Sequence, residues 1–391
     1  MDKLLKACDQ NIPSIVLLLD LSAAFDTVDH TKLLNILHCE IGITGTALNW
    51  YKSFLTGRTL KVKIGESYSD MIELLYGVAQ GSVSGPRLFN IYVRSLYQYV
   101  TPTKYEIDGF ADDHQLMKQF IPKLQHSLSE DINFCLNRLS DWMRDHFLCL
   151  NESKTKILVI SPPSISKQII ISGIFMNSNC IRFSESAKNL GFILDSQLTF
   201  DQQVNKVVKS CFMVLKNLAK IKYFLSPEHL KTLICSYIFS KIDYCNVMYY
   251  RLSSINIKKL QHVQNCAARL VTGQNIRSSV DNLFTQFHWL KVRERILYKM
   301  LLTVHKCLHQ QAPNSLCKLL QYAELQRLMN LRETKTRGRF GERCFSHAGP
   351  KLWNALPFNI RNEHDTESFK KLLKSYLMLH AEEYNIKINR T

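Results

Sequence analysis

Three acidic residues stand out because they follow short apolar segments that resemble β-strands. Asp112 and Asp113 are adjacent, and Asp20 ends the apolar run of residues 15–19. Neighbouring carboxylates repel each other, so a fold that holds them together usually does so around a cation. A single acid after a strand more often serves a solvated turn. The order and surroundings of all three favour a site for two divalent ions, which would stabilise the attacking and leaving oxygens of phosphoryl transfer.

The charge is distributed unevenly along the 391 residues. Residues 1–200 carry 19 Lys and Arg against 20 Asp and Glu, whereas residues 201–391 carry 31 against 13. A nearly neutral, acid-bearing half joined to a strongly basic half suits an enzyme that steers a polyanion onto metal-binding carboxylates. A solvated basic surface is the equal alternative for the basic half taken alone. The hydrophobic content of 46% excludes a disordered chain.

The hydrophobic pattern predicts a mixed α and β first half and a helical second half. In the first half we expect a strand at 14–20, a helix at 22–38, a hairpin strand within 51–64, a hairpin around Asp112, a helix at 129–147, strands within 148–160 and a short strand within 188–200. After residue 200 the period becomes helical, with Ser226 and Pro227 as a helix start, helices up to Gly273 and a helix at 292–309. Residues 327–343 predict a loop or extended arm.

The twelve cysteines are scattered singly, which indicates free thiols in a reducing compartment. Several of them, Cys211, Cys235 and Cys266, lie within apolar helical patterns and are expected to be buried. Cys344 and His347 are spaced like half of a zinc site, but no second half is evident. Since no signal peptide or transmembrane stretch is found, we expect an intracellular protein, nuclear or cytoplasmic, without membrane contact.

Five segments, taken in order, resemble a known set of motifs. The segments are residues 18–26 (motif A), 77–86 (motif B), 110–113 (motif C), 150–155 (motif D) and 189–195 (motif E). Their order and spacing resemble the reverse transcriptases of non-LTR (LINE-type) retrotransposons, especially the jockey-like branch. The resemblance continues through the sequences Asp-Tyr-Cys-Asn at 243–246, His-Trp-Leu at 288–290 and Pro-Lys-Leu-Trp-Asn at 350–354, and so covers nearly the whole chain.

The resemblance implies an α+β fold, in which a polymerase palm (an antiparallel sheet with helices) is followed by a mainly helical thumb and a C-terminal region. The implied domains are a palm with a remnant of the fingers at residues 1–200, a helical thumb at 201–275 and a basic C-terminal region at 276–391. In the thumb, lysines on the polar face of one helix would grip a duplex through its phosphates: Lys206, Lys209, Lys216, Lys220 and Lys222.

The resemblance also implies roles for individual residues. Two Mg²⁺ ions, with Mn²⁺ as a possible substitute, would be bound by Asp20, Asp112 and Asp113. Lys154 would face the triphosphate. The alternative is that Lys154 is a plain surface lysine. The nucleotide would meet the backbone of Leu21, the ring of Phe25 against the sugar 2′ position, and the Gln80-Gly81 turn. Ordinary core packing is the alternative for Phe25, and a plain turn for Gln80-Gly81. Asp26 and Asp29 are expected to cap or tie the following helix.

The implied reaction is the attack of a primer 3′-hydroxyl on the α-phosphate of a dNTP. The partners would be an RNA template and a DNA primer, and no obligate protein partner is evident.

The sequence departs from the family pattern in several places. The chain starts almost at motif A, without the endonuclease and fingers motifs that normally precede it. Ala79 and Lys291 stand where proline is usual, Ser84 where leucine is usual, and Arg87 where an apolar residue is usual. These changes predict weak or no activity. A nonenzymatic nucleic-acid-binding protein derived from the same scaffold is the second hypothesis, and an unselected copy that folds poorly is the third.

Overall fold

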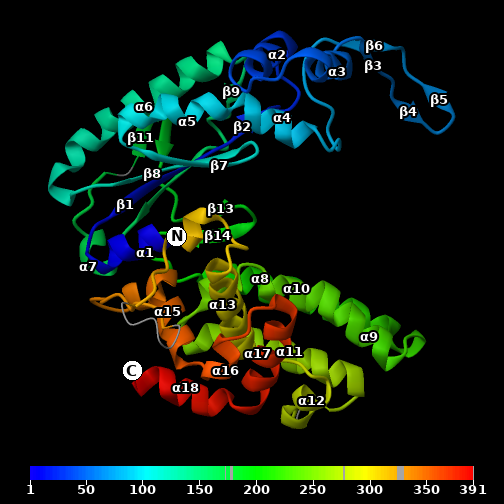
Figure 1. Cartoon of the computed structure of the whole chain (residues 1–391), viewed down its shortest axis with the longest axis vertical. Coiled ribbons are helices and arrows are strands. Elements are labelled where there is room, and N and C mark those ends of the chain that lie inside the picture. Colours follow the sequence, from blue (N-terminus) through cyan, green and yellow to red (C-terminus); the bar gives the residue numbers. More distant parts are fainter. Residues whose placement is uncertain (172, 177–178, 276–277, 324–329, 391) are drawn as a thin grey trace. The chain divides into compact units, whose positions relative to one another are not determined.

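The chain folds into two compact units, which the computed structural model describes for residues 1–391 except 172, 177–178, 276–277, 324–329 and 391 (Figure 1). One unit consists of Ile12–Leu190, and the other combines Met1–Asn11 with Gly191–Thr391. Both ends of the chain therefore belong to the same unit. The domain boundaries expected at residues 200 and 275 stay predictions.

A four-stranded antiparallel sheet with the order β10-β1-β8-β7 is the centre of the first unit. β1 (Ser14–Leu19) lies between β10 (Lys156–Ile160) and β8 (Asp113–Gln119), and β7 (Glu106–Phe110) pairs with β8 as a tight hairpin. As a central strand, β1 is buried along nearly all its length. This burial accounts for the continuous apolar run of its sequence. The strand expected at 14–20 and the hairpin expected around Asp112 are thereby confirmed.

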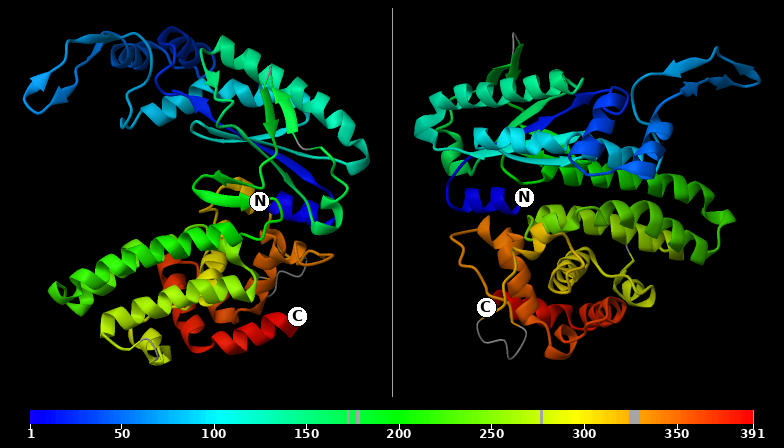
Figure 2. Two further views of the ribbon diagram at one scale, coloured as in Figure 1. Left: turned by 180° about the vertical axis from the view of Figure 1, so that it is seen from behind. Right: turned by 45° about the horizontal axis from the view of Figure 1, so that its top comes forward.

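Helices α5 (Arg94–Val100) and α6 (Gln125–Asp145) lie together against one face of this sheet (Figures 1 and 2). The apolar stripe of α6, including Ile132, Leu136 and Leu139, is fully buried and contributes to the same core as β1. The helix expected at 129–147 is therefore confirmed, with its ends shifted. Besides these and an exposed hairpin described below, this unit contains α2 (His30–Cys39), α3 (Gly45–Leu55), α4 (Gly85–Tyr92), α7 (Pro163–Ser166), β2 (Leu21–Ser22), β9 (Cys149–Leu150), β11 (Gly173–Met176), β12 (Asn179–Arg182) and β13 (Ser186–Asn189).

The helix expected at 22–38 is wrong over residues 22–29, nearly its first half. The chain continues as β2 and a turn, and α2 begins only at His30, after Asp29 as N-cap. The Asp29 carboxylate accepts a hydrogen bond from the backbone N–H of Lys32 at 2.6 Å, which confirms the capping role expected of it. The short strand expected within 188–200 is β14 (Phe192–Asp195), two residues later than its apolar run suggests.

A two-part hairpin between α3 and α4 extends into solvent. β3 (Arg58–Leu60) pairs with β6 (Ile72–Leu74), and β4 (Lys63–Ile64) pairs with β5 (Ser67–Tyr68). The alternation that predicts a strand within 51–64 is thus confirmed, but the strands are exposed along their whole length and add nothing to the core.

The second unit is mainly helical. The expected helix start is confirmed, since the Ser226 hydroxyl accepts a hydrogen bond from the His229 N–H at 3.2 Å, and Gly273 ends α11 with a φ of +69°. The helices are α1 (Asp2–Asp9), α8 (Asp201–Ile221), α9 (Pro227–Ile234), α10 (Ser240–Asp243), α11 (Ser254–Thr272), α12 (Asp281–Gln286), α13 (Val292–Leu308), α14 (Asn314–Cys317), α15 (Phe345–Ala355), α16 (Phe358–Arg361), α17 (Thr366–Leu379) and α18 (Ala381–Arg390).

The lesser sequence expectations have mixed outcomes. Of the three cysteines expected to be buried, Cys211 is, whereas Cys235 is exposed and Cys266 is half-buried. His347, which is spaced from Cys344 like half of a zinc site, is hydrogen-bonded through Nδ1 to the carbonyl oxygen of Thr334 at 2.6 Å. In the part of the chain that the structure describes, no helix is both long enough and apolar enough to span a bilayer. Of the arm expected at 327–343, residues 327–329 lie outside the described residues.

Candidate active site

The register of the sheet brings the three acids to one edge. Leu19 at the end of β1 is paired with His114, so Asp20 follows at the place where Asp113 begins β8. The β7–β8 hairpin pairs Phe110 with Asp113, which leaves only Ala111 and Asp112 in the turn. Ala111 adopts a φ of +56°, as a tight two-residue hairpin turn requires. Asp20 and the adjacent acid pair therefore meet at the same end of neighbouring strands.

The electrostatics of Asp113 show that these acids interact. Partial burial is the largest effect that raises the pKa of Asp113, and the negative charges of Asp112 and Asp20 raise it further. His114 and Lys188 act in the opposite direction. In the described residues, however, no group of three or more His, Cys, Asp or Glu side chains is close enough together to hold a metal ion. The acids thus influence one another without forming a tight cluster.

Asp20 is held by the segment of motif D. The pairing of Leu21 with Leu150 and a hydrogen bond from the Asn151 N–H to the Asp20 carbonyl oxygen at 2.8 Å fix its backbone. Lys154 Nζ lies 3.5 Å from Asp20 Oδ2. That carboxylate oxygen is buried and accepts no hydrogen bond. The structure therefore brings together Asp20 and Lys154, and it buries the side chain of Leu21.

His114 is a residue of this edge that the sequence analysis did not single out. It is 2% exposed, and burial lowers its pKa, so the imidazole is neutral at pH 7. Its Nδ1 donates a hydrogen bond to the Asp112 carbonyl oxygen at 3.1 Å, which fixes the turn. Gly109 on β7 faces the imidazole so closely that an added Cβ would lie 2.9 Å from His114 Cδ2. The only signal in the sequence is the position of the histidine directly after the acid pair.

Motifs A and B form a second group, through hydrogen bonds between their loops. The N–H of Val78 donates to the Phe25 carbonyl oxygen at 2.8 Å, and Gln80 Nε2 donates to Asp26 Oδ1 at 3.0 Å. Gly77, with a φ of +90°, packs so tightly on the backbone of Asp26 that a Cβ would lie 3.0 Å from it. The Asp26 side chain thus ties the two loops, whereas no hydrogen bond from the following helix to its carboxylate is found among the described residues, contrary to the expectation for Asp26. Phe25 lies next to the exposed turn that carries Gln80.

The remaining predicted residues of this group have clear surroundings. The Phe25 ring is half-buried and stacks on Phe89 of α4, with ring centroids 4.6 Å apart. Gly81 is exposed and has a φ of +79°, a conformation that favours glycine. Phe25 is joined to Asp20 by the short strand β2. The acids at the sheet edge and the residues of the motif A and motif B loops therefore lie in the same unit and are linked by one short segment.

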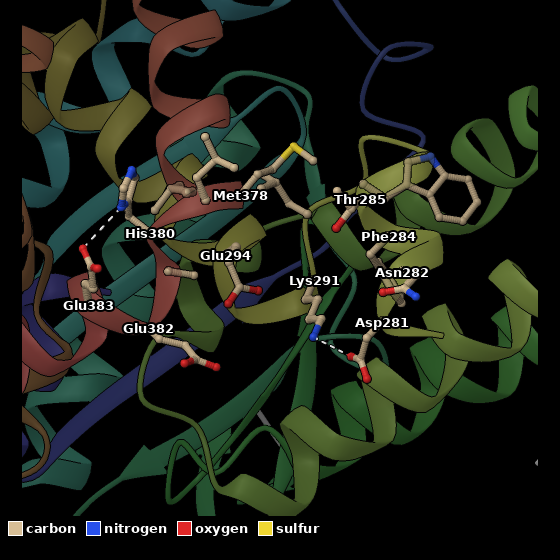
Figure 3. A pocket seen from close by; sticks show the side chains of 15 residues that line it. Asp281, Asn282, Phe284, Thr285, Lys291, Glu294, Met378, His380, Glu382 and Glu383 are labelled. Atoms are coloured by element: carbon tan, nitrogen blue, oxygen red, sulfur yellow. Dashed lines mark hydrogen bonds and ion pairs between the residues drawn. The ribbon is translucent and has the colours of Figure 1, made fainter. Parts of the chain in front are cut away.

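A separate pocket of about 460 Å³ lies in the second unit (Figure 3). Its charged side chains are mostly acidic, and four of its side chains form two pairs: Lys291 with Asp281 at 2.9 Å and His380 with Glu383 at 3.2 Å. Burial raises the pKa of Glu294, whose Oε2 has no hydrogen-bond partner. None of the residues predicted to be catalytic or nucleotide-binding lines this pocket.

Comparisons with known proteins agree with the motif pattern. Residues 3–194 match the family described as "Reverse transcriptase (RNA-dependent DNA polymerase)". The chain is 26% identical over 282 residues to the "Probable RNA-directed DNA polymerase from transposon X-element" of Drosophila melanogaster, covering 70% of this chain and 30% of that protein. It is 22% identical over 282 residues to the "RNA-directed DNA polymerase from mobile element jockey" of the same species, covering 70% and 29%.

The chain spans about 30% of the length of these curated relatives. A solved structure of telomerase from Candida albicans with a fragment of telomeric RNA matches over 70% of this chain and 48% of that chain, at 12% identity and a TM-score of only 0.34. The family match and the antiparallel sheet fit a palm-type polymerase fold. Residues 3–194 therefore match the reverse transcriptase family, and the chain resembles the reverse transcriptases of non-LTR retrotransposons.

Proposed function

We propose that this chain carries out RNA-directed DNA synthesis, with Asp20, Asp112 and Asp113 as its catalytic acids. The observation that supports this most is the strand register that brings the three acids to one edge of the sheet. The reaction joins a primer 3′-hydroxyl to the α-phosphate of a dNTP and releases pyrophosphate. The RNA template, the DNA primer and the dNTP are part of the proposal.

The donor set fits a divalent cation, which reverse transcriptases generally use. Mg²⁺ and Mn²⁺ prefer carboxylate oxygens, and Asp20 Oδ2 is a buried oxygen that accepts no hydrogen bond and lies 3.5 Å from the Lys154 ammonium. When bound by the three acids, such ions would lower the pKa of the primer hydroxyl and stabilise the charge on the pyrophosphate. Because the described residues form no tight acid cluster, joint coordination requires the side chains to move closer together.

The other residues would bind and orient the nucleotide. Lys154, already beside Asp20, would supply positive charge or a proton to the leaving pyrophosphate. Phe25 would close the space at the sugar 2′ position, since its ring is held by the stack on Phe89. The exposed Gln80-Gly81 turn would allow the backbone to approach the nucleotide closely. In the second unit, the exposed lysines of α8 would contact phosphates of the template–primer duplex.

Primer extension on an RNA template with Mg²⁺ tests this function. We expect dNTP incorporation by the wild-type chain and its loss in Asp112→Asn, whereas Asp141→Asn, an exposed aspartate on α6, should retain it. The loose arrangement of the acids favours a second candidate, a nonenzymatic nucleic-acid-binding protein. Equal incorporation by both variants would refute the catalytic roles, and tight template binding without any incorporation would support the second candidate.

A further inference from the structure

Two sequence segments that the proposed chemistry does not use meet in one pocket of the second unit. The segments are Asp-Tyr-Cys-Asn at 243–246 and His-Trp-Leu at 288–290. The pocket has a volume of about 500 Å³, within the range of small-molecule sites. It is lined by Cys235, Phe239, Ser240, Asp243, Asn246, Phe287, His288, Trp289, Leu290, Arg295, Tyr298, Lys299 and Lys374.

Aromatic rings form much of this lining. Trp289 packs edge-on against Phe239 and against Phe287, with ring centroids 4.7 Å and 5.0 Å apart. Phe239 and Trp289 are nearly buried, so the neighbouring helices fix their orientation, while Phe287 is half-buried. Of the three rings, Phe287 is the accessible one, and Lys231 Nζ lies 4.6 Å from its centroid. A partly exposed, well-supported ring with a cation beside it suits a flat, aromatic ligand such as a nucleobase, since every base has a face that can stack.

The charges in the pocket suit an anion. Asp243, the one acid in the lining, accepts hydrogen bonds from both Nε and a terminal nitrogen of Arg295 and is therefore neutralised. Lys299 and Lys374 are exposed, and no ion pair to either is found among the residues that the structure describes. Two lysine charges thus remain for a ligand, as a phosphate group requires.

A buried amide beside the rings offers a polar contact. Asn246 is 2% exposed, and its Nδ2 donates to Asp243 Oδ1 at 3.2 Å. Its Oδ1 has no hydrogen-bond partner. A buried polar atom without a partner is uncommon, and an exocyclic amino group of a base would be a suitable donor to it.

The neighbouring acidic pocket of Figure 3 provides a contrast within the same unit. Both pockets share Trp289 and Leu290 in their lining. On one side the charged residues are mainly acidic, including Glu294, Glu382 and Glu383, which would repel a phosphate. On the other side they are mainly basic. Of the two pockets beside Trp289, therefore, only the one with mainly basic side chains suits the phosphate of a nucleotide.

We propose that the pocket lined by residues 243–246 and 288–290 binds one unpaired nucleotide of a single-stranded RNA. Phe287, the half-buried ring, would stack on the base, and the buried Trp289 would support Phe287 edge-on. Lys299 and Lys374 would bind the phosphates of the nucleotide. The inference rests on the proposed function only in taking RNA as the ligand, because the binding itself requires no catalysis. It assigns the binding of a single RNA strand to residues 243–246 and 288–290, which lie outside the candidate active site in the sequence.

RNA binding by the full chain tests this proposal. The probe is a fluorescein-labelled 12-nucleotide oligo(A) RNA, and the readout is fluorescence anisotropy in the presence of EDTA. We expect Lys299→Gln/Lys374→Gln and Phe287→Ala each to weaken binding by about fivefold or more. The matched control, Lys318→Gln/Lys335→Gln, removes the same charge from exposed lysines outside the pocket and should bind within about twofold of the wild type.

Thermal unfolding of each variant and photocrosslinking of the RNA complete the test. Crosslinks of the wild type should map to the peptide containing Phe287 and Trp289. The proposal is overturned if folded pocket variants bind like the control or if this peptide gives no crosslink. Primer extension by the same preparations separates the two proposals: pocket-dependent binding without incorporation would contradict only the proposed function, and incorporation with pocket-independent binding would contradict only this inference.

Discussion

Asp113 is the residue whose ionisation reports most directly on the candidate active site. Burial, Asp112 and Asp20 raise its pKa, so the folded protein binds the proton of Asp113 more tightly than the unfolded chain does. The stabilising effect of that proton is fully present below the unfolded pKa and is lost as the pH rises through the folded pKa. At neutral pH, the ionised carboxylate therefore destabilises the protein when no metal is bound.

We predict that Asp113→Asn is more stable than the wild type at pH 7 in EDTA, and that the difference disappears as the pH falls towards about 4. Urea unfolding between pH 4 and pH 8 measures this effect. The same variant should lose dNTP incorporation. Asp141→Asn removes an exposed carboxylate of the same unit, and an equal, pH-dependent gain in that control would contradict the prediction.

The residues of the candidate site differ in how far the sequence could reveal them. Asp20 and the acid pair are visible because each follows a strand pattern, and the register confirms that they share one edge. The hydrogen bond between Gln80 and Asp26 could not be foreseen, because it joins loops 54 residues apart. The buried His114 was missed for a similar reason, since burial depends on what the sheet packs against.

At the scale of elements, α2 illustrates how a cap overrides a hydrophobic pattern. The apolar residues after Ser22 fit a helix, yet the turn before Asp29 is held by hydrogen bonds to the motif B loop, such as that from the Gly77 N–H to the Val28 carbonyl oxygen at 2.8 Å. Long periodic segments such as α6 and α13 were predictable because their burial follows the helical period. Boundaries set by contacts between loops were not.

Removal of the Asp29 cap should be measurable. We predict that Asp29→Ala lowers the free energy of unfolding by about 1 kcal/mol, since the N–H of Lys32 loses its acceptor. Thr44→Ala is a suitable control, because Thr44 occupies the N-cap of α3 without making a side-chain capping hydrogen bond. Chemical denaturation compares the two variants, and an equal loss in both would show that the capping hydrogen bond contributes little.

Helix α8 presents its lysines to solvent, as a phosphate-binding element should. Its apolar residues, including Val204, Val207 and Leu215, are buried, whereas Lys216 and Lys220 are exposed. We predict that Lys216→Gln/Lys220→Gln weakens binding to a primed RNA template and reduces the slope of log K against log salt by about 2. The control Lys318→Gln/Lys335→Gln should leave this slope unchanged, and an equal change there would indicate a general charge effect.

At the scale of the whole molecule, the chain begins and ends in the same unit. Asp9, at the end of α1, accepts hydrogen bonds from the backbone N–H groups of Arg337 at 2.7 Å and Gly341 at 2.9 Å. Asp2, at the start of α1, accepts from the hydroxyl of Ser346 at 3.0 Å. No local sequence pattern could predict these bonds, because they join residues more than 300 positions apart. The first eleven residues are thus part of the core structure of the second unit.

We therefore predict that Asp9→Ala destabilises the second unit by about 2 kcal/mol, because two backbone donors lose a charged acceptor. Hydrogen exchange should quicken in α15, the helix that follows this contact, while β1 and β8 of the first unit keep their protection. Asp70→Ala, an exposed aspartate of the hairpin, should change neither region. If exchange quickened equally in both units, the two would unfold as one cooperative body, and the role assigned to α1 would have to extend to the whole chain.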